Sequence, residues 1–157
     1  MARQCVIGVF ELATLHPRHP ETPKGSRTWE WLVPDGKRQI TVYKRLDGEI
    51  AGEHFHKGED PSKNPEYFLL VSGKIRFEFI NESGTLHQVE LSAENGPVEL
   101  IIYPFALHRA TPLTDCCFIE YRKTIFDPEK SDTFGPEHFT IKTDWQENEP
   151  SLKKGAR

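Results

Sequence analysis

Residues Gly48–Gly73 read GEIAGEHFHKGEDPSKNPEYFLLVSG and place two histidines one residue apart in a segment of strand-forming residues. In a β-strand, residues i and i+2 project from the same face, so His54 and His56 direct their imidazoles to one point while Phe55 faces the other way. Imidazole nitrogen is a good ligand for zinc, iron, nickel, manganese and copper. The pair therefore indicates a metal site on a strand.

Two more side chains are placed where they can join this pair. Glu66 opens the apolar run YFLLV, which a Ser-Gly turn connects to the next expected strand, so its carboxylate can lie beside the histidines. Glu59 and Asp60 are alternative carboxylates, in a loop punctuated by prolines. His108 follows a later apolar strand just past a proline turn, in YPFALHR. The sequence thus offers three histidines and one carboxylate as candidate ligands.

The middle of the chain repeats short β-branched or aromatic runs separated by turn residues, as in an all-β sandwich or barrel. In KIRFEFI, for example, apolar and charged residues alternate, which predicts a strand with one buried face. Dipeptides such as Asp-Gly and Ser-Gly provide the hairpin turns. We expect strands at Gln39–Leu46, Ile50–His56, Tyr67–Val71, Lys74–Ile80, Leu86–Leu91, Val98–Tyr103 and Phe118–Arg122.

The chain divides into three zones. Residues 1–26 form an N-terminal arm that contains HPRHPETPKG, where prolines and a glycine oppose regular structure. Residues 27–125 form the β-rich body, and residues 126–157 form a polar tail. We expect the tail to pack partly on the body through the apolar residues it retains, which are Phe126, Phe134, Phe139, Ile141 and Trp145.

Composition limits the function. The chain has 157 residues and a net charge of −4, so we expect one domain without the basic stripe that nucleic acid requires. No apolar run approaches the roughly 18 residues of a membrane span. Glu11 interrupts the apolar stretch VIGVFELA, so we do not interpret it as a signal peptide. The spacing of Cys5, Cys116 and Cys117 suits neither a disulfide framework nor a zinc ribbon. We therefore expect a cytoplasmic protein.

The motifs G-x5-H-x-H, E-x6-G and a later P-x3-H, in the order found here, resemble the two motifs of the cupin superfamily. The resemblance implies a small antiparallel β-barrel or jelly roll. It also implies that His54, His56, Glu66 and His108 bind one divalent transition metal inside the barrel. The Glu66-to-Gly73 spacing favours Glu66 over the loop carboxylates.

A second resemblance covers roughly Gly48 to Glu137. The segments HFHKGEDPSKNPEYFLLVSGKIRFEF and IFDPEKSDTFGPE look like the cupin part of capsular-polysaccharide UDP-sugar reductases. No GxGxxG motif follows a strand here, so we expect the cupin part alone, without the dinucleotide-binding domain of those reductases.

Such a ligand set leaves one or two coordination positions open, as a catalytic site requires, and does not choose strongly among zinc, iron, manganese and nickel. The first hypothesis is an epimerase or isomerase of a nucleotide-linked keto-sugar, with the metal as Lewis acid. Tyr67 and His87 are the weak candidates for the base. Arg45, Arg76 and Arg109 are candidates for binding the diphosphate, because guanidinium pairs with phosphate oxygens.

Two other functions stay open. One is a non-haem Fe(II) dioxygenase of a small organic substrate, because the same ligands suit Fe(II) with free positions for substrate and oxygen. The other is a non-catalytic cupin module that binds sugar or metal. We also expect a homodimer, because Trp29 and Trp31 follow the proline-rich arm and can contact a neighbouring barrel. A small-molecule ligand, and neither nucleic acid nor membrane, is the expected partner.

Overall fold

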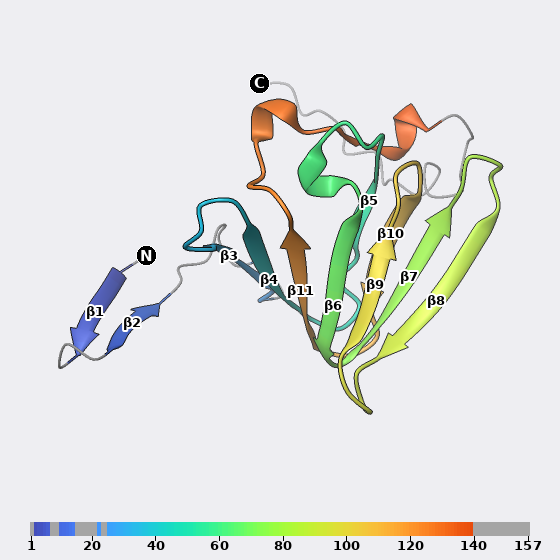
Figure 1. Cartoon of the computed structure of the whole chain (residues 1–157). Coiled ribbons are helices and arrows are strands. Elements are labelled where there is room, and N and C mark those ends of the chain that lie inside the picture. Colours follow the sequence, from blue (N-terminus) through green and yellow to red (C-terminus); the bar gives the residue numbers. More distant parts are fainter. Residues whose placement is uncertain (1, 7–9, 15–21, 23–24, 140–157) are drawn as a thin grey trace, which may run out of the picture.

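The computed structural model describes residues 2–6, 10–14, 22 and 25–139, and its body consists of two five-stranded antiparallel sheets (Figure 1). One sheet has the strand order β12 (Thr133–Phe134), β5 (Ala51–His56), β10 (Leu107–Pro112), β7 (Lys74–Ile80) and β8 (Leu86–Ser92). The other has the order β3 (Arg27–Leu32), β4 (Gln39–Arg45), β11 (Cys116–Arg122), β6 (Glu66–Ser72) and β9 (Val98–Ile102). The jelly-roll class of fold expected from the sequence is confirmed.

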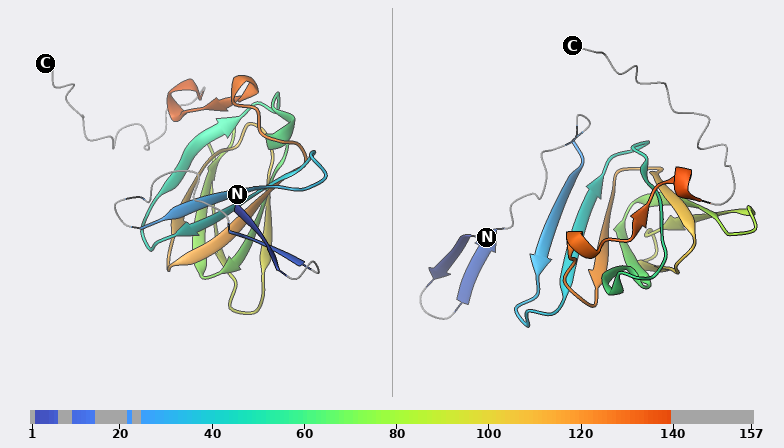
Figure 2. Two further views of the ribbon diagram at one scale, coloured as in Figure 1. Left: turned by 90° about the vertical axis from the view of Figure 1, so that its left-hand side faces the viewer. Right: turned by 90° about the horizontal axis from the view of Figure 1, so that it is seen from above.

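The two sheets pack face to face, and the further views show them as two layers (Figure 2). Side chains alternate along each strand, so every second residue enters the space between the layers. One layer contributes Leu70 and Phe118 to the core, and the other contributes Ile75, Phe77 and Ala110. These residues form the hydrophobic core between the sheets, and the candidate ligands His54, Glu66 and His108 lie beside it.

The Ser-Gly turn predicted after Glu66 connects β6 to β7 as expected. Gly73 has φ of +82°, and a Cβ atom built there would lie 2.3 Å from the backbone oxygen of Asp115. A glycine is therefore required by both the backbone conformation and the space.

The described residues contain four strand regions beyond those predicted, one of which is the short tail strand β12. Strand β3 (Arg27–Leu32) forms one edge of its sheet, and β10 (Leu107–Pro112) lies inside the other sheet. Burial alternates along β10 from His108 on, but the buried residues are His108, Ala110 and Pro112, so the sequence lacks the β-branched or aromatic residues that mark a strand. The arm also differs from the irregular chain that we expected, because β1 (Ala2–Val6) and β2 (Phe10–Thr14) form a two-stranded sheet.

The tail continues with the short 3-10 helices η2 (Pro128–Lys130) and η3 (Pro136–His138) on either side of β12. Phe134 and Phe139 pack against Phe55, with ring centroids 5.5 and 5.1 Å from that of Phe55. Ile141 and Trp145, which we also expected to pack, lie outside the described residues. Within the described part of the chain, none of the helices has the length and apolar character needed to cross a bilayer.

Candidate metal centre

Three strands bring the candidate ligands together inside the barrel. His54 and His56 lie on β5, Glu66 is the first residue of β6, and His108 lies on β10, a strand that we did not predict. Because β10 pairs with β5 and His108 faces His54 directly in the register, two distant parts of the sequence place their imidazoles side by side.

A β-bulge shapes the strand just before the two histidines. The register between β5 and β10 shifts so that Arg109 pairs with Gly52 while His108 pairs with His54, which leaves Glu53 as the extra residue. Gly52 and Glu53 both have positive φ, of 96° and 59°. A Cβ atom at Gly52 would lie 3.1 Å from the Arg109 backbone, so glycine permits the close approach of the strands. The bulge turns Glu53 outward and directs His54 into the barrel.

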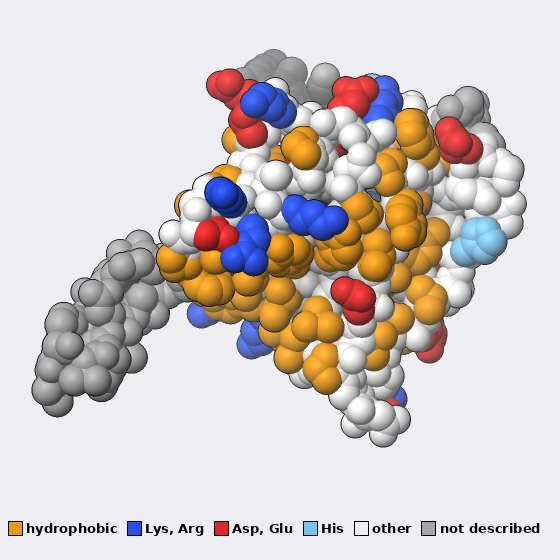
Figure 3. Space-filling view, viewed as in Figure 1, with side chains coloured by type: hydrophobic (Ala, Val, Ile, Leu, Met, Phe, Trp, Pro, Cys, Tyr) orange, Lys and Arg blue, Asp and Glu red, His pale blue; other side chains and the backbone are white. Residues whose placement is uncertain are grey.

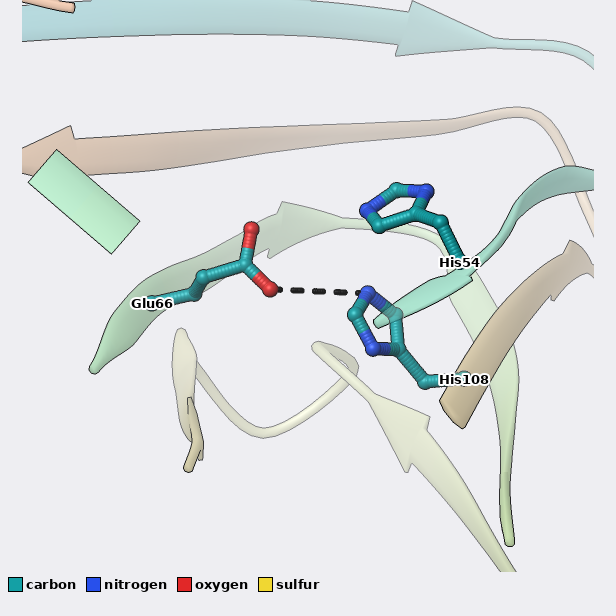
Figure 4. A group of neighbouring side chains, drawn as sticks. All are labelled: His54, Glu66 and His108. Atoms are coloured by element: carbon teal, nitrogen blue, oxygen red, sulfur yellow. Dashed lines mark ion pairs between the residues drawn. The ribbon is translucent and has the colours of Figure 1, made fainter. Parts of the chain in front are cut away.

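His54, Glu66 and His108 form a triad whose ligand atoms all lie within 4.8 Å of one another (Figure 4). The imidazole centroids of His54 and His108 are 4.6 Å apart. His108 Nε2 lies 3.5 Å from Glu66 Oε2, and both side chains are buried. Two nitrogens and one oxygen that converge in a protected position are a donor set for a transition metal.

His56 is adjacent to this triad without being part of it. Its Nε2 lies 3.4 Å from the other oxygen of Glu66, Oε1, and its Nδ1 lies 3.1 Å from Asp132 Oδ1. Asp132 also accepts a hydrogen bond from the backbone of Glu59. A carboxylate accepts only, so Nδ1 of His56 donates to Asp132, and this contact holds the ring with Nε2 facing Glu66. This orientation suits a metal ligand.

Burial and neighbouring charges set the protonation of the triad. Burial, reinforced by the neighbouring His108, lowers the pKa of His54 to about 3. Burial also lowers the pKa of His108. Burial alone would raise the pKa of Glu66, but contact with His56 and the charge of Lys63 outweigh it and hold that pKa below its usual range. The triad is therefore two neutral imidazoles and one carboxylate at neutral pH, the forms in which these groups bind metals.

Two buried polar atoms without hydrogen-bond partners in the described part of the chain indicate that a metal ion fits this site. His56 Nε2 and Glu66 Oε2 are buried and have no hydrogen-bond partner among the described residues. An unsatisfied buried polar atom costs about 1–3 kcal/mol, and a cation beside both atoms would remove that cost. The residues present therefore fit one divalent transition metal, and the absence of sulfur among them leaves zinc, iron, manganese and nickel as candidates.

The triad lines a pocket of about 100 Å³ that is partly open to solvent. Aromatic side chains line much of it, and Lys63 and Glu120 add charges that the sequence did not indicate as functional. Lys63 Nζ donates hydrogen bonds of 2.7 Å to both Glu66 Oε1 and Glu120 Oε1. Glu120 accepts further bonds from Tyr43 and Arg122, so the carboxylate is fully paired.

The structure brings only one of the predicted substrate-binding and basic residues to this pocket. Arg45 lines it. Tyr67 follows Glu66 on β6 and therefore faces the outer side of the sheet. His87 is exposed on β8. Arg76 and Arg109 pair with the carboxylates of Glu90 and Glu78 on the outside of their sheet.

Sequence reasoning missed Lys63, Glu120 and Asp132. The charged runs KGED and DPEKSD have the composition of solvated loops, yet each contains one carboxylate that is about 2% exposed, Asp60 in the first and Asp132 in the second. The signal for Asp132 was present in the segment IFDPEKSDTFGPE, which carried the second resemblance. Lys63 and Glu120 left no such signal, because nothing in a local pattern shows that a charged side chain turns inward.

Comparison with known proteins gives the fold and no sequence family. No family model matches the chain, and no curated protein sequence matches it. CapF, the capsular polysaccharide assembling protein of Staphylococcus aureus, is similar in structure, with a TM-score of 0.64, 22% identity, and coverage of 79% of this chain and 32% of that chain. A structure of CapF with the inhibitor 3-isopropenyl-tropolone gives a TM-score of 0.63, 23% identity, and coverage of 78% and 34%.

Oxalate decarboxylase of Bacillus subtilis is also similar, in a structure of one of its point mutants, with a TM-score of 0.58, 17% identity, and coverage of 87% of this chain and 32% of that chain. A further structure of that enzyme was used to study its Mn(II) centres. This chain spans about a third of the length of these proteins. The likeness, together with the two-sheet architecture, shows a cupin fold.

Proposed function

We propose that the protein is a metal-binding cupin that acts on a small molecule inside its barrel. The observation that carries the proposal is the triad of His54, Glu66 and His108, whose ligand atoms converge within 4.8 Å in a buried pocket. His56, held by Asp132, supplies the fourth ligand. Four protein ligands leave positions open on most of the candidate metals, which is the arrangement of a catalytic rather than a structural site.

The proposed substrate is a nucleotide-linked keto-sugar, and the proposed reaction is epimerisation or isomerisation. The metal would supply Lewis acidity that stabilises negative charge on the ketone oxygen. The protein's own contribution is to orient the sugar and to limit its contact with water, through a pocket lined by Phe68, Phe77 and Phe118. Likeness to CapF, a capsular polysaccharide assembling protein, supports a sugar-linked substrate.

The pocket volume limits how much of the substrate can enter. The volume is about 100 Å³, below the about 300–1,000 Å³ of typical small-molecule sites. Only the reacting part of the sugar would therefore enter, and the nucleotide would lie toward the opening. Arg45 lines the pocket wall and is our candidate for binding the diphosphate.

Isotope exchange tests this function without knowledge of the product. Metal-loaded protein is incubated with UDP- and dTDP-linked keto-sugars in D₂O, and mass spectrometry follows deuterium at the carbon beside the ketone. We expect exchange in the wild type and a loss of at least about 100-fold in Glu66→Gln, because a neutral amide is a poor ligand. Binding without exchange would leave a non-catalytic binding module, and no binding of any sugar nucleotide would contradict the proposal.

We further propose that the protein is a homodimer, associated through the outer face of the sheet that contains β3, β4, β11, β6 and β9. Two rows of directly paired residues cross this face and are almost entirely apolar: Trp29, Val42, Ile119, Leu69 and Glu99, then Trp31, Ile40, Tyr121, Tyr67 and Ile101. Hydrophobic side chains gather there in the space-filling view (Figure 3). Apolar patches of this extent mark interaction sites.

The distribution of charge on this face supports a second copy of the protein as its partner. Glu99 lies exposed on the edge strand β9, while Arg27 and Lys44 lie exposed near the opposite edge of the same face. In a two-fold dimer whose axis runs parallel to the strands, each edge of one copy meets the opposite edge of the other, so the acidic edge would face the basic one twice.

A further inference from the structure

Lys63 is a buried cation in the same pocket as the candidate metal centre. Its residue is 8% exposed, and its ammonium lies between two buried carboxylates, those of Glu66 and Glu120. Buried lysines are rare unless paired, and a lysine that shares a carboxylate with a metal site requires an explanation.

The surrounding structure holds Lys63 in place. It ends the 3-10 helix η1 (Pro61–Lys63), whose first turn is capped by the side chain of Asp60. Asn64 Nδ2 donates to the backbone oxygen of Gly58 and closes the loop. Glu120 is fixed in turn by Arg122. The ammonium is thus a fixed feature of the pocket rather than a solvated side chain that entered it.

The charges on the pocket wall favour an anion once a metal is bound. Two cationic residues, Arg45 and Lys63, and two anionic ones, Glu66 and Glu120, line the pocket and cancel. A divalent ion at the triad then leaves an excess of two positive charges, in surroundings where aromatic side chains limit solvation. Opposite charge is strongly favoured in such a site.

The two oxygens of Glu66 set the spacing of the ligand. Oε1 accepts from Lys63, while Oε2 faces His108 and is the oxygen left for the metal. The ammonium and the metal position are therefore neighbours along one carboxylate. A ligand with oxygens on adjacent atoms can reach both.

The Lys63 ammonium has a third N–H group that neither of these two hydrogen bonds uses. Two of its three N–H groups bond to Glu66 and Glu120, which are its partners among the described residues. We propose that the third N–H binds a negatively charged oxygen of the ligand, so that the site favours anionic ligands with oxygens on adjacent atoms, such as the enediolate that a keto-sugar forms on loss of a proton. This inference rests on the proposed metal centre and names the charge of what that centre binds.

The test compares two probes of the same skeleton, the dianion oxalate and the neutral oxamide, by calorimetric titration of metal-loaded protein. We expect Lys63→Met to weaken oxalate binding about 10- to 100-fold and to leave oxamide binding within about threefold, with bound metal unchanged. Lys63→Arg retains the charge and should recover part of the difference. Lys74→Met, which removes a lysine paired with Glu94 on the surface, is the matched control.

Lys63→Met leaves two buried carboxylates facing each other and can therefore fail to fold. A second variant keeps the test valid in that case. The double variant Lys63→Met/Glu120→Gln removes one charge of each sign and should show the same loss of oxalate over oxamide. An unchanged ratio in metal-loaded, folded variants would overturn the role of Lys63. A wild type that binds oxalate through Lys63 but holds no metal would refute the metal centre and retain the anion site, and a wild type that binds neither would refute both.

Discussion

At the scale of single residues, the candidate centre depends on partners that fix the direction of each ligand. Asp132 is the clearest case, since it holds Nδ1 of His56 and thereby directs Nε2 toward Glu66. Partners of this kind affect metal affinity about 10- to 100-fold in other metal sites. The role of Asp132 can therefore be measured without knowing the substrate.

We predict that Asp132→Ala lowers the affinity for zinc about 10- to 100-fold, because His56 loses its orientation. Competition with a chromophoric chelator gives the dissociation constant. Glu129→Gln changes an exposed acidic residue of the same segment and should bind zinc like the wild type. Equal affinities for all three proteins would show that Asp132 does not position the ligand.

A second residue-scale prediction concerns Cys116, which is a buried free thiol. Burial raises the pKa of Cys116 from 9.0 to about 11. The thiolate is the reactive form, so alkylation by iodoacetamide should be very slow at pH 8 and should rise about tenfold per pH unit up to about pH 11. Peptide mass spectrometry of Cys116 gives the rate, and labelling at pH 8 as fast as in the urea-unfolded protein would contradict the prediction.

At the scale of elements, the bounds of a strand could be predicted where one of its faces is exposed to solvent. Strand β7 matched its predicted bounds because charged and apolar residues alternate in KIRFEFI. Strand β10 was missed because its buried positions after Leu107 are His108, Ala110 and Pro112, and not the β-branched or aromatic residues typical of strands. The consequence for the site was that His108 was not assigned to a strand, although it is held by a central one.

The β6–β7 hairpin supplies a prediction at this scale. Gly73→Ala should destabilise the protein by about 2–4 kcal/mol, because the new Cβ would meet the Asp115 backbone and the residue would keep a positive φ. Gly36→Ala carries a similar φ of +67° with nothing within 4 Å, so it should cost only about 1 kcal/mol. Urea unfolding measures both. Equal losses would mean that backbone strain, and not the close approach, requires glycine at position 73.

At the scale of the whole molecule, the fold unites groups that no local pattern connects. The motif spacing was enough to indicate His54, His56, Glu66 and His108, because the resemblance carried their roles as a set. The bond between Lys63 and Glu120 spans 57 residues and depends on how the loop before β6 folds over β11. Such a contact follows from topology rather than from the composition of either segment.

The outer sheet face gives a prediction at the same scale. Leu69→Glu places a charge in the middle of the apolar rows and should convert the dimer to a monomer at micromolar concentration, as measured by sedimentation velocity. Leu86→Glu, at an apolar residue 54% exposed on β8 of the other sheet, is the control and should remain dimeric. A monomeric wild type would refute the proposed interface.

The most direct measurement of the metal centre is elemental analysis of chelator-free protein. Wild type is compared with His54→Ala, Glu66→Ala and His87→Ala, the last removing an exposed histidine on the edge strand β8, two strands from His108. We predict close to one zinc, iron, manganese or nickel ion per chain in wild type and in His87→Ala, and loss of that ion in the other two. A wild type that holds no metal and cannot be reloaded, or a triad variant that retains its metal, would contradict the assignment.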